Sequence, residues 1–286
     1  MFDQVEQYHR AASVAEALRL LQTGKGRARV VAGCTDFALQ SDDSVRILID
    51  ITRAGLSYLR SKDGWLSIGA TTTMADLEES SAVRNLAGGI LARAAASCGS
   101  VQIRNVATIG GNMAHGSPAA DLAPPLVALD AVMVVVSPAG RQRIGVGDYL
   151  AKTKAPNALL AEIRIPDGPS GKRCGWSFQK LGRTAVDISL VSAAAGLEVD
   201  ARGKVKWARI ALGAVAPMAM RADETEKLIT GRILDRGLLD EAGLAVRREI
   251  GPISDQRASA DYRREMSGVL VRRALQECAS QSGWPL

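Results

Sequence analysis

Two short glycine-bearing stretches of the chain have the composition of loops that close around a phosphate group. AGCTD spans residues 32–36, and TIGGN spans residues 108–112. Glycine lets the backbone approach a ligand without an intervening Cβ, and successive N–H groups in such a turn form a concave site for an anion. Thr35, Thr108 and Asn112 add side-chain donors. Each stretch alone has an ordinary turn as its alternative interpretation, whereas the two facing each other would form a site for one diphosphate.

Neither stretch matches a common nucleotide-binding motif, because the chain has no G-x-x-x-x-G-K-[ST] loop and no G-x-G-x-x-G that opens a helix. Asp121 follows the second stretch and precedes the apolar run LAPPLVAL. A carboxylate beside a phosphate site is useful where it accepts from ribose hydroxyls. The other interpretation is an N-cap of the next helix, where Pro124 suits the first turn. The two roles are compatible.

Composition is typical of a soluble globular protein. The chain has 286 residues, 47% of them apolar and 23% charged, which is enough for two domains and a core without disulfides. The longest apolar stretch, residues 122–136, contains Pro124, Pro125 and Asp130 and cannot serve as a membrane-spanning helix. We expect a cytoplasmic protein.

Metal chemistry within this chain is not expected. The four cysteines lie far apart in sequence, whereas iron–sulfur and zinc sites usually show short spacings such as C-x₂-C. The two histidines, His9 and His115, do not build a zinc site either. Redox chemistry would therefore need an organic cofactor or a partner.

Arginines are concentrated between residues 247 and 273, and the net charge of the chain is +6. The favoured interpretation is a solvated, partly salt-bridged helical face. A docking surface for an acidic partner is the second interpretation. Nucleic-acid binding is the weakest, because aromatic residues make up only 4% of the chain and no recognition motif accompanies the charge.

Periodicity and capping residues predict an α+β fold. Ser13 and Glu16 form a capping box at one helix, and Thr73 and Ser259 are further candidate N-caps. Runs of strands followed by helices favour α+β over strict alternation. Strands are predicted at residues 29–32, 45–51, 65–70, 132–137, 159–166, 174–181, 188–199 and 205–215, a helical segment interrupted by glycine at 82–98, and helices from 222 onward.

Four motifs, in order along the chain, resemble those of a known family. They are AGCTD (32–36), QIRNVATIGGN (102–112), SPAADLAPPLVALDA (117–131) and FQKLGRTAVDISLVSAA (178–194). The sequence is similar to the FAD-binding, medium subunit of molybdenum hydroxylases, a family that includes carbon monoxide dehydrogenase and xanthine dehydrogenase. The resemblance spans essentially the whole chain, and the RN-x-A-T-x-GGN block is its most specific part.

The resemblance implies a fold of the vanillyl-alcohol-oxidase type. Two α+β subdomains would bind FAD, at residues 1–57 and 58–170. A C-terminal domain at residues 173–286 would combine a small antiparallel sheet with helices.

The resemblance also implies a non-covalent FAD site. Residues 30–37 would wrap the pyrophosphate, and residues 108–112 would hold it from the other side. Asp121 would take a ribose or adenine-side hydroxyl. Gln179 and Lys180 lie where the family has a polar or basic residue near the flavin ring, and a cation there would stabilise the reduced ring. The full set is Val30, Val31, Ala32, Gly33, Cys34, Thr35, Asp36, Phe37, Cys98, Thr108, Ile109, Gly110, Gly111, Asn112, Ser117, Asp121, Leu160, Gln179, Lys180 and Ile188.

Some positions depart from the family pattern or carry an open alternative. Cys34 replaces the second glycine of the first loop, so we expect a negative φ there or a slightly shifted loop; a small packing residue is the default role for its thiol. Cys98 and Leu160 match positions that flank the cofactor. Ile188 resembles the xanthine dehydrogenase version, with a plain core residue as the alternative. His115 lies in the second loop region, where it either approaches a phosphate or faces solvent.

The function implied by the resemblance is electron transfer within a heteromeric enzyme. Molybdopterin and two [2Fe–2S] clusters would lie in separate large and small subunits, and FAD in this chain would pass electrons to an external acceptor such as NAD⁺, a quinone or O₂. A dimer of heterotrimers is expected, and no general base. One alternative is a stand-alone FAD oxidoreductase on the same cofactor fold. A second is a basic adaptor or nucleic-acid-binding protein.

Overall fold

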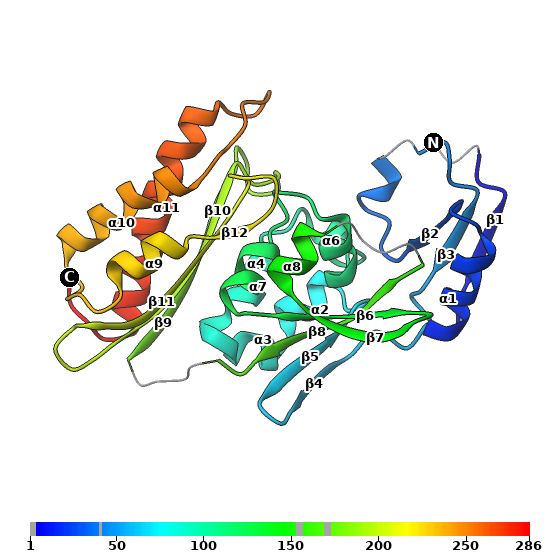
Figure 1. The fold of residues 1–286 in the computed structure, drawn as a ribbon, viewed down its shortest axis with the longest axis horizontal. Coiled ribbons are helices and arrows are strands. Elements are labelled where there is room, and N and C mark those ends of the chain that lie inside the picture. Colours follow the sequence, from blue (N-terminus) through cyan, green and yellow to red (C-terminus); the bar gives the residue numbers. More distant parts are fainter. Residues whose placement is uncertain (1–3, 40–41, 153–156, 169–172) are drawn as a thin grey trace.

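The structure is a computed structural model that describes residues 4–39, 42–152, 157–168 and 173–286. Its strands form three sheets that follow one another along the chain (Figure 1). The predicted α+β class is confirmed. Residues 169–172, where the predicted domains at 58–170 and 173–286 meet, fall outside the described residues. The domain boundaries at 1–57, 58–170 and 173–286 stay predictions.

The first sheet is parallel and small. In spatial order it contains β1 (Gln7–Arg10), β3 (Ile47–Asp50) and β2 (Ala28–Val31). Helix α1 (Val14–Thr23) connects β1 to β2 and begins at the predicted cap, since Ser13 Oγ accepts from the N–H of Glu16. The Glu16 carboxylate accepts in turn from the N–H of Ala12, one residue before the cap, at 2.8 Å. A short 3₁₀ turn, η1 (Phe37–Leu39), follows β2.

The second sheet has antiparallel neighbours throughout. Its order is β4 (Leu59–Lys62), β5 (Trp65–Gly69), β8 (Leu159–Pro166), β6 (Val132–Ser137) and β7 (Gly140–Gly145). The helical elements of this part are α2 (Met74–Glu79), α3 (Ser81–Asn85), η2 (Leu86–Gly89), α4 (Ile90–Ala96), α5 (Val101–Arg104), α6 (Ile109–His115), α7 (Ala123–Ala128) and α8 (Val146–Ala151). The glycine interruption of the 82–98 helical segment is confirmed, because Gly88 and Gly89 have positive φ angles.

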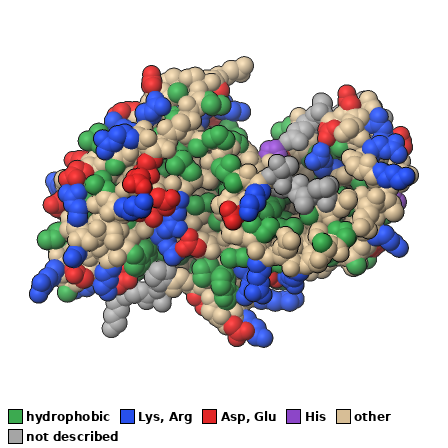
Figure 2. Space-filling model, viewed as in Figure 1, with side chains coloured by type: hydrophobic (Ala, Val, Ile, Leu, Met, Phe, Trp, Pro, Cys, Tyr) green, Lys and Arg blue, Asp and Glu red, His purple; other side chains and the backbone are tan. Residues whose placement is uncertain are grey.

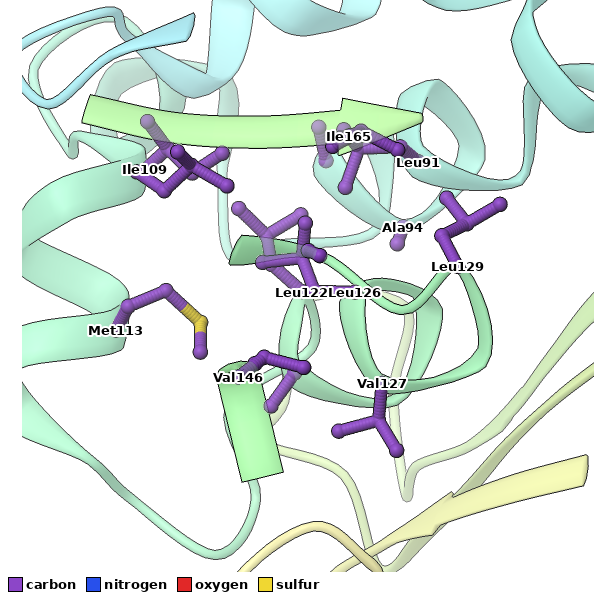
Figure 3. Packing of buried hydrophobic residues seen from close by; sticks show 14 of the residues in the cluster. Leu91, Ala94, Ile109, Met113, Leu122, Leu126, Val127, Leu129, Val146 and Ile165 are labelled. Atoms are coloured by element: carbon purple, nitrogen blue, oxygen red, sulfur yellow. The ribbon is translucent and has the colours of Figure 1, made fainter. Parts of the chain in front are cut away.

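The core of this part fixes the orientation of α6. Ile109 and Met113 are fully buried and lie on the side of α6 that faces Leu122 and Leu126 of the α7 region (Figure 3). This burial at positions i and i+4 turns the two glycines, which lie between them in sequence, toward a different side of the helix.

The third sheet separates the C-terminal helices from the FAD-binding region predicted from the motifs. Its order is β12 (Met220–Arg221), β11 (Val205–Gly213), β10 (Val191–Val199) and β9 (Cys174–Leu181). Along β10, Ala194 joins the core that contains α7, whereas Ala193 and Ala195 join the core formed with the C-terminal helices α9 (Asp223–Ile229), α10 (Arg236–Glu249) and α11 (Ala260–Gln281). The sheet is therefore buried on both faces.

Several of the C-terminal arginines form ion pairs with neighbouring carboxylates, and acidic and basic side chains are interspersed over this part of the molecule (Figure 2). Arg247 pairs with Glu265 at 2.7 Å, and Arg272 pairs with Asp240 at 3.0 Å. Arg264 pairs with Asp261 one turn earlier on α11. The favoured interpretation, a solvated and partly salt-bridged helical face, is therefore confirmed for these residues.

Glu277 of α11 connects the C-terminal helices to α4. Its carboxylate accepts from Arg93 and from Ser177, each at 2.5 Å. Burial alone would raise the pKa of Glu277, but the hydrogen bonds from Ser177 and Arg93 outweigh burial, and the pKa lies below its usual range. Because the folded-state pKa is the lower one, this stabilisation is present above the unfolded-state pKa of about 4.3 and is lost as pH falls through the folded-state pKa.

We expect Glu277→Gln to lower the free energy of unfolding by about 1–2 kcal/mol at pH 7. The difference from the wild type should shrink below pH 4, where the wild-type carboxylate also becomes protonated. Urea unfolding at pH 7 and pH 3.5 measures both quantities. Glu265→Gln, at an exposed ion pair, is the matched control and should change little. An equal difference at both pH values would contradict the prediction.

Candidate functional site

The first loop, residues 32–37, leaves the end of β2 next to the end of β3. Cys34 in this loop has φ +55°, in the left-handed region that costs a residue with a Cβ about 1 kcal/mol. The expectation of a negative φ is therefore wrong. The half-buried thiol packs against the small cluster formed by Val31, Val45 and Leu48. Burial and then the charge of Asp50 raise the pKa of Cys34, so the thiol is neutral and fills space.

Cys34→Gly should relieve this backbone conformation. We expect an unchanged FAD content and a melting temperature that is equal or higher, because the strain removed and the chain entropy gained in the unfolded state are both about 1 kcal/mol. Cys34→Val, with a β-branched side chain at the same φ, should be clearly destabilised. Thermal unfolding of both variants measures the difference. A Cys34→Gly variant less stable than Cys34→Val would contradict the assignment.

Four backbone donors of the first loop are unused in the part of the chain that the structure describes. The N–H groups of residues 33–36 donate to no acceptor there. Their carbonyls are used instead: Cys34 O accepts from the N–H of Ala38, and Asp36 O accepts from the N–H of Leu39. Four consecutive unpaired N–H groups on a partly exposed turn form the kind of concave donor set that binds an anion.

The second loop, residues 108–112, is the first turn of a helix and not an open turn. Thr108 is the N-cap of α6, and its hydroxyl accepts from the N–H of Gly111 at 3.1 Å. The N–H of Ile109 donates to Thr72 O, and that of Gly110 donates to Ala70 O. The prediction that this stretch supplies a set of free N–H groups is therefore wrong, because these donors have protein partners.

The two loops are nevertheless in contact. A Cβ on Gly33 would lie 2.0 Å from Val106 O and 2.9 Å from Ala107 Cα, so Gly33 packs directly against the residues that lead into α6. A Cβ on Gly110 would lie 2.5 Å from Ala70 O, so this glycine allows a close contact within the protein. Gly111 would meet only the Thr108 hydroxyl. Gly33 thus allows contact between the loops, Gly110 allows α6 to pack against Ala70, and Gly111 leaves room for the capping hydroxyl of Thr108.

A cavity of about 340 Å³ lies beside the joined loops, a size typical of a small-ligand pocket. One wall comes from the end of β2, a second from α6, and the remainder from β6, β7, β8 and α8. The lining residues are Val30, Val31, Ala32, Ile51, Ala70, Thr108, Gly110, Gly111, Ala114, Val135, Gln142, Ile144, Asp148, Tyr149, Lys152, Ala158, Leu159 and Leu160.

The far wall of this cavity contains residues that the sequence did not indicate. Gln142 and Ile144 of β7, and Asp148, Tyr149 and Lys152 in and after α8, belong to no motif. Alternation along β7 could have shown that Gln142 and Ile144 share a face. Nothing local indicated that this face meets β2.

Asn112 carries a polar atom that the protein leaves unsatisfied. Its Oδ1 is buried and has no hydrogen-bond partner among the described residues. Oδ1 is an acceptor, and a 180° rotation of the amide about its terminal torsion would place the Nδ2 donor at the same position. A buried polar atom without a partner destabilises the apoprotein by about 1–3 kcal/mol. Asn112 is therefore a candidate ligand contact.

Asp121 forms a buried ion pair with Lys180 of β9. Lys180 Nζ donates to Asp121 Oδ2 and to Ser97 O, each at 2.8 Å. Ser189 Oγ donates to Asp121 Oδ1 at 2.6 Å. The capping interpretation is wrong, because Leu122 is the N-cap of α7 and has no side-chain cap. Burial raises the pKa of Asp121, whereas the charge of Lys180 and its hydrogen bond lower it. The effect of burial is the larger one, so the pKa lies above its usual value.

Cys98 lies in the same neighbourhood. The pKa of Cys98 is raised to about 11, mainly by burial. The charges of Asp121 and Asp36 raise it further, and the charge of Lys180 lowers it. The structure thus brings one residue from the first loop, Asp36, near the ion pair. Cys98 is a neutral side chain here and has no nucleophilic character.

Gln179 and Lys180 point to opposite faces of β9, as neighbouring strand residues must. Gln179 Nε2 donates to Glu277 of α11 at 2.8 Å, on the side away from Asp121. The expectation that both residues lie near one ring is therefore not supported for Gln179. Ile188 is 41% exposed, so the plain core interpretation is wrong.

The remaining predicted residues lie at the edges of the site. Ser117 Oγ accepts from the N–H of Ala119 in the segment before α7. Phe37 begins η1, and Thr35 lies half-buried in the first loop. His115 is exposed in the last turn of α6.

The described residues contain neither a candidate metal site nor a candidate membrane span. No group of three or more His, Cys, Asp or Glu side chains there is arranged to hold a metal ion. None of the described helices is both long enough and apolar enough to cross a membrane.

Family models match both parts of the chain. The model of the FAD binding domain in molybdopterin dehydrogenase matches residues 2–168, and that of the CO dehydrogenase flavoprotein C-terminal domain matches residues 176–278.

Relatives match over the full length. The chain is 32% identical to the xanthine dehydrogenase FAD-binding subunit of Escherichia coli O157:H7, covering 100% of both chains. It is also 32% identical to the carbon monoxide dehydrogenase medium chain of Afipia carboxidovorans, covering 96% of this chain and 97% of the other. In the solved carbon monoxide dehydrogenase of Hydrogenophaga pseudoflava, which lacks the Mo-pyranopterin moiety, a chain 32% identical superposes with a TM-score of 0.91 over 98% of this chain and 99% of that one. The chain therefore belongs to the FAD-binding subunits of molybdopterin dehydrogenases, as its motifs indicated.

Proposed function

We propose that this chain is the electron-transfer flavoprotein subunit of a heteromeric molybdenum hydroxylase. It would receive electrons from [2Fe–2S] clusters of a small partner subunit and pass them to an external acceptor. The observation that carries the proposal is the contact of Gly33 with residues 106–107, which joins a loop of four free N–H groups to the start of α6. A diphosphate needs such a set of converging donors.

The residues present fit the pyrophosphate of FAD. The N–H groups of residues 33–36 would bind phosphate oxygens. The amide of Asn112, rotated so that Nδ2 takes the unsatisfied position, would add a side-chain donor. Thr35 and Gly111 lie in the same two loops. Thr108 would act by capping α6, since its hydroxyl already accepts from Gly111.

The cavity and the ion pair give the two ends of the cofactor different surroundings. The cavity walls near β2 and Leu160 are mainly aliphatic and suit the flat adenine ring. Lys180, Asp121, Cys98 and Ile188 would border the flavin ring. We omit Gln179 from this set, because its amide is engaged by Glu277.

The task of this chain's own residues is to bind, orient and shield the cofactor. FAD, when bound, supplies redox chemistry that accepts electrons singly and releases them in pairs. Lys180 and Asp121 fix a charged pair at a buried position, and Ser189 orients the carboxylate. We propose no general base in this chain.

We propose the partner subunits from the names of the matched relatives. The matched proteins are called a FAD-binding subunit and a medium chain. A molybdopterin subunit, a [2Fe–2S] subunit and a dimer of heterotrimers are the assembly we propose. Identity to a xanthine dehydrogenase subunit and to a carbon monoxide dehydrogenase chain is equal at 32%. A xanthine-dehydrogenase-like character therefore rests on Ile188 alone.

FAD titration of the purified full chain tests the proposal. We expect a yellow protein that binds FAD at one equivalent and releases the flavin when denatured. A folded chain that takes up no FAD would refute it. Co-expression with the neighbouring reading frames separates the alternatives: a stand-alone oxidoreductase would purify alone, and an adaptor for nucleic acid would show salt-sensitive binding without a chromophore.

Asn112→Leu provides a more specific test of the pyrophosphate assignment. Removal of an unsatisfied buried amide should raise the stability of the apoprotein, whereas loss of a ligand contact should weaken FAD binding roughly tenfold. Thermal unfolding of apoprotein and fluorescence titration with FAD measure the two effects. Most damaging substitutions lower both quantities together, so the opposite signs are diagnostic. Equal FAD affinity in wild type and variant would remove Asn112 from the site.

A further inference from the structure

Arg263 is a buried charged side chain in the C-terminal domain that the proposed chemistry does not use. It is 4% exposed and lies in the first turn of α11, just after the Ser259 N-cap. A cation is unfavourable at this end of a helix, because the helix dipole is positive there. Burial of a guanidinium is also unfavourable unless its donors are satisfied. The stability of α11 therefore does not explain this residue.

The guanidinium joins three separate segments. Nη1 donates to Leu190 O at 2.6 Å and to Ala214 O at 3.4 Å. Nη2 donates to Asp255 Oδ1 at 2.9 Å, in the segment before α11. Such a planar fork serves several acceptors in fixed directions, which the single ammonium of lysine does less well.

Two of these segments hold the stretch that ends in Asp121. Ser189, the residue before Leu190, donates its hydroxyl to Asp121 Oδ1. The N–H of Ala214 donates to Pro118 O at 2.7 Å. Ala214 has φ +62°, a conformation that persists for a residue with a Cβ only where its surroundings impose it. Arg263 therefore binds the carbonyls of Leu190 and Ala214, next to the points where their two segments contact residues 118–121.

We propose that Arg263 is a positioning residue for the flavin site. It aligns the 189–190 and 214 segments so that Ser189 and Ala214 hold residues 118–121, and Asp121 then stays paired with Lys180 beside the cofactor. Arg263 does not touch the cofactor. This inference rests on the proposed FAD site and adds to it a residue of α11, which lies well beyond the last sequence motif, residues 178–194.

The test compares full-length variants loaded with FAD. Arg263→Met removes the three donor contacts, Arg263→Lys keeps the charge, and Ser189→Ala removes the hydroxyl that the proposal invokes. Arg264→Met is the matched control, because Arg264 is the next residue of the same helix, is much less buried than Arg263, and pairs with Asp261 of the same helix. FAD affinity and the two-electron midpoint potential of the bound flavin are measured for each.

We expect Arg263→Met to weaken FAD binding roughly tenfold, with a shift in midpoint potential, and Arg263→Lys to recover part of both. Adding Ser189→Ala to Arg263→Met, or to Arg263→Lys if the former does not fold, should change the affinity by less than about twofold, because both act on Asp121. Additive effects, or an Arg263→Met variant equal to Arg264→Met, would overturn the inference. A wild-type chain that binds no FAD would instead refute the proposed function.

Discussion

Gly33→Ala is expected to weaken FAD binding at least about a hundredfold. The added Cβ would lie 2.0 Å from Val106 O and 2.7 Å from Val106 C, and backbone atoms cannot move aside as a flexible side chain can. Overpacking of this kind typically costs about 1–3 kcal/mol. If the loops separate instead, the N–H groups of residues 33–36 lose their common direction, and each lost bond to a charged phosphate is worth about 1.5–3 kcal/mol.

The measurement is a fluorescence titration with FAD at a temperature where the apoprotein is folded. Gly251→Ala is the matched control, since a Cβ there meets nothing within 4 Å and the backbone has no positive φ. The control should bind FAD as the wild type does. A Gly33→Ala variant with near wild-type affinity would show that the contact between the loops is not needed to hold the cofactor.

Local structure, such as helix caps and a helix kink, was predictable from the sequence. Ser13, Thr73 and Ser259 cap helices as expected, because a capping hydroxyl reaches only two or three residues along the chain. The family resemblance supplied the cofactor, which no spacing of residues could establish. The kink at residues 87–89 followed from two adjacent glycines.

Non-local contacts were not predictable. Asp121 looked like a helix cap or a ribose ligand, but its nearest partners are Lys180 and Ser189, far along the chain. The TIGGN stretch looked like an open turn, since each glycine in a helix costs about 1 kcal/mol relative to alanine. Burial of Ile109 and Met113 in the core outweighs that cost. Contacts between residues distant in sequence thus determined both the partners of Asp121 and the helical conformation of the TIGGN stretch.

One outcome was available from the sequence and was missed. Residues 174–181 were predicted as a strand, and adjacent strand residues face opposite sides. Gln179 and Lys180 could therefore not both face one ring. The left-handed conformation of Cys34 is a different case, because the family's glycine at this position already indicated a positive φ.

Single substitutions at the Asp121–Lys180 pair are expected to be far more damaging than the double one. Both side chains are less than 10% exposed, at 7% and 9%. Removing one partner leaves the other charge buried, which costs about 3–5 kcal/mol, whereas replacing both by apolar residues is often neutral. Asp121→Leu and Lys180→Met should thus each lower the stability strongly, and the double variant should recover most of it. Urea unfolding of the apoproteins measures this cycle.

Substitutions at the same pair should also change the midpoint potential of the bound flavin, in a pattern that differs from their effect on stability. Burial raises the pKa of Asp121 despite its lysine partner, because desolvation of the carboxylate outweighs the charge of Lys180. At 2.8 Å the carboxylate compensates the lysine charge, so the site presents a nearly neutral pair. Asp121→Asn exposes the cation and should raise the midpoint potential, and Lys180→Met should lower it. Shifts of about 20–80 mV follow from about 1–4 kcal/mol for one nearby charge at the effective dielectric of such sites.

The double variant Asp121→Asn/Lys180→Met separates charge from structure. It restores neutrality without the pair, so its potential should return close to that of the wild type. Its FAD affinity should stay reduced, because Ser97 O has lost the lysine donor and Ser189 donates to a neutral amide oxygen, a weaker acceptor than the carboxylate. Redox titration of the bound flavin and fluorescence titration give the two values independently. If both single variants shift the potential in the same direction, the flavin ring does not lie beside this pair, and the assignment of Lys180 to the site fails.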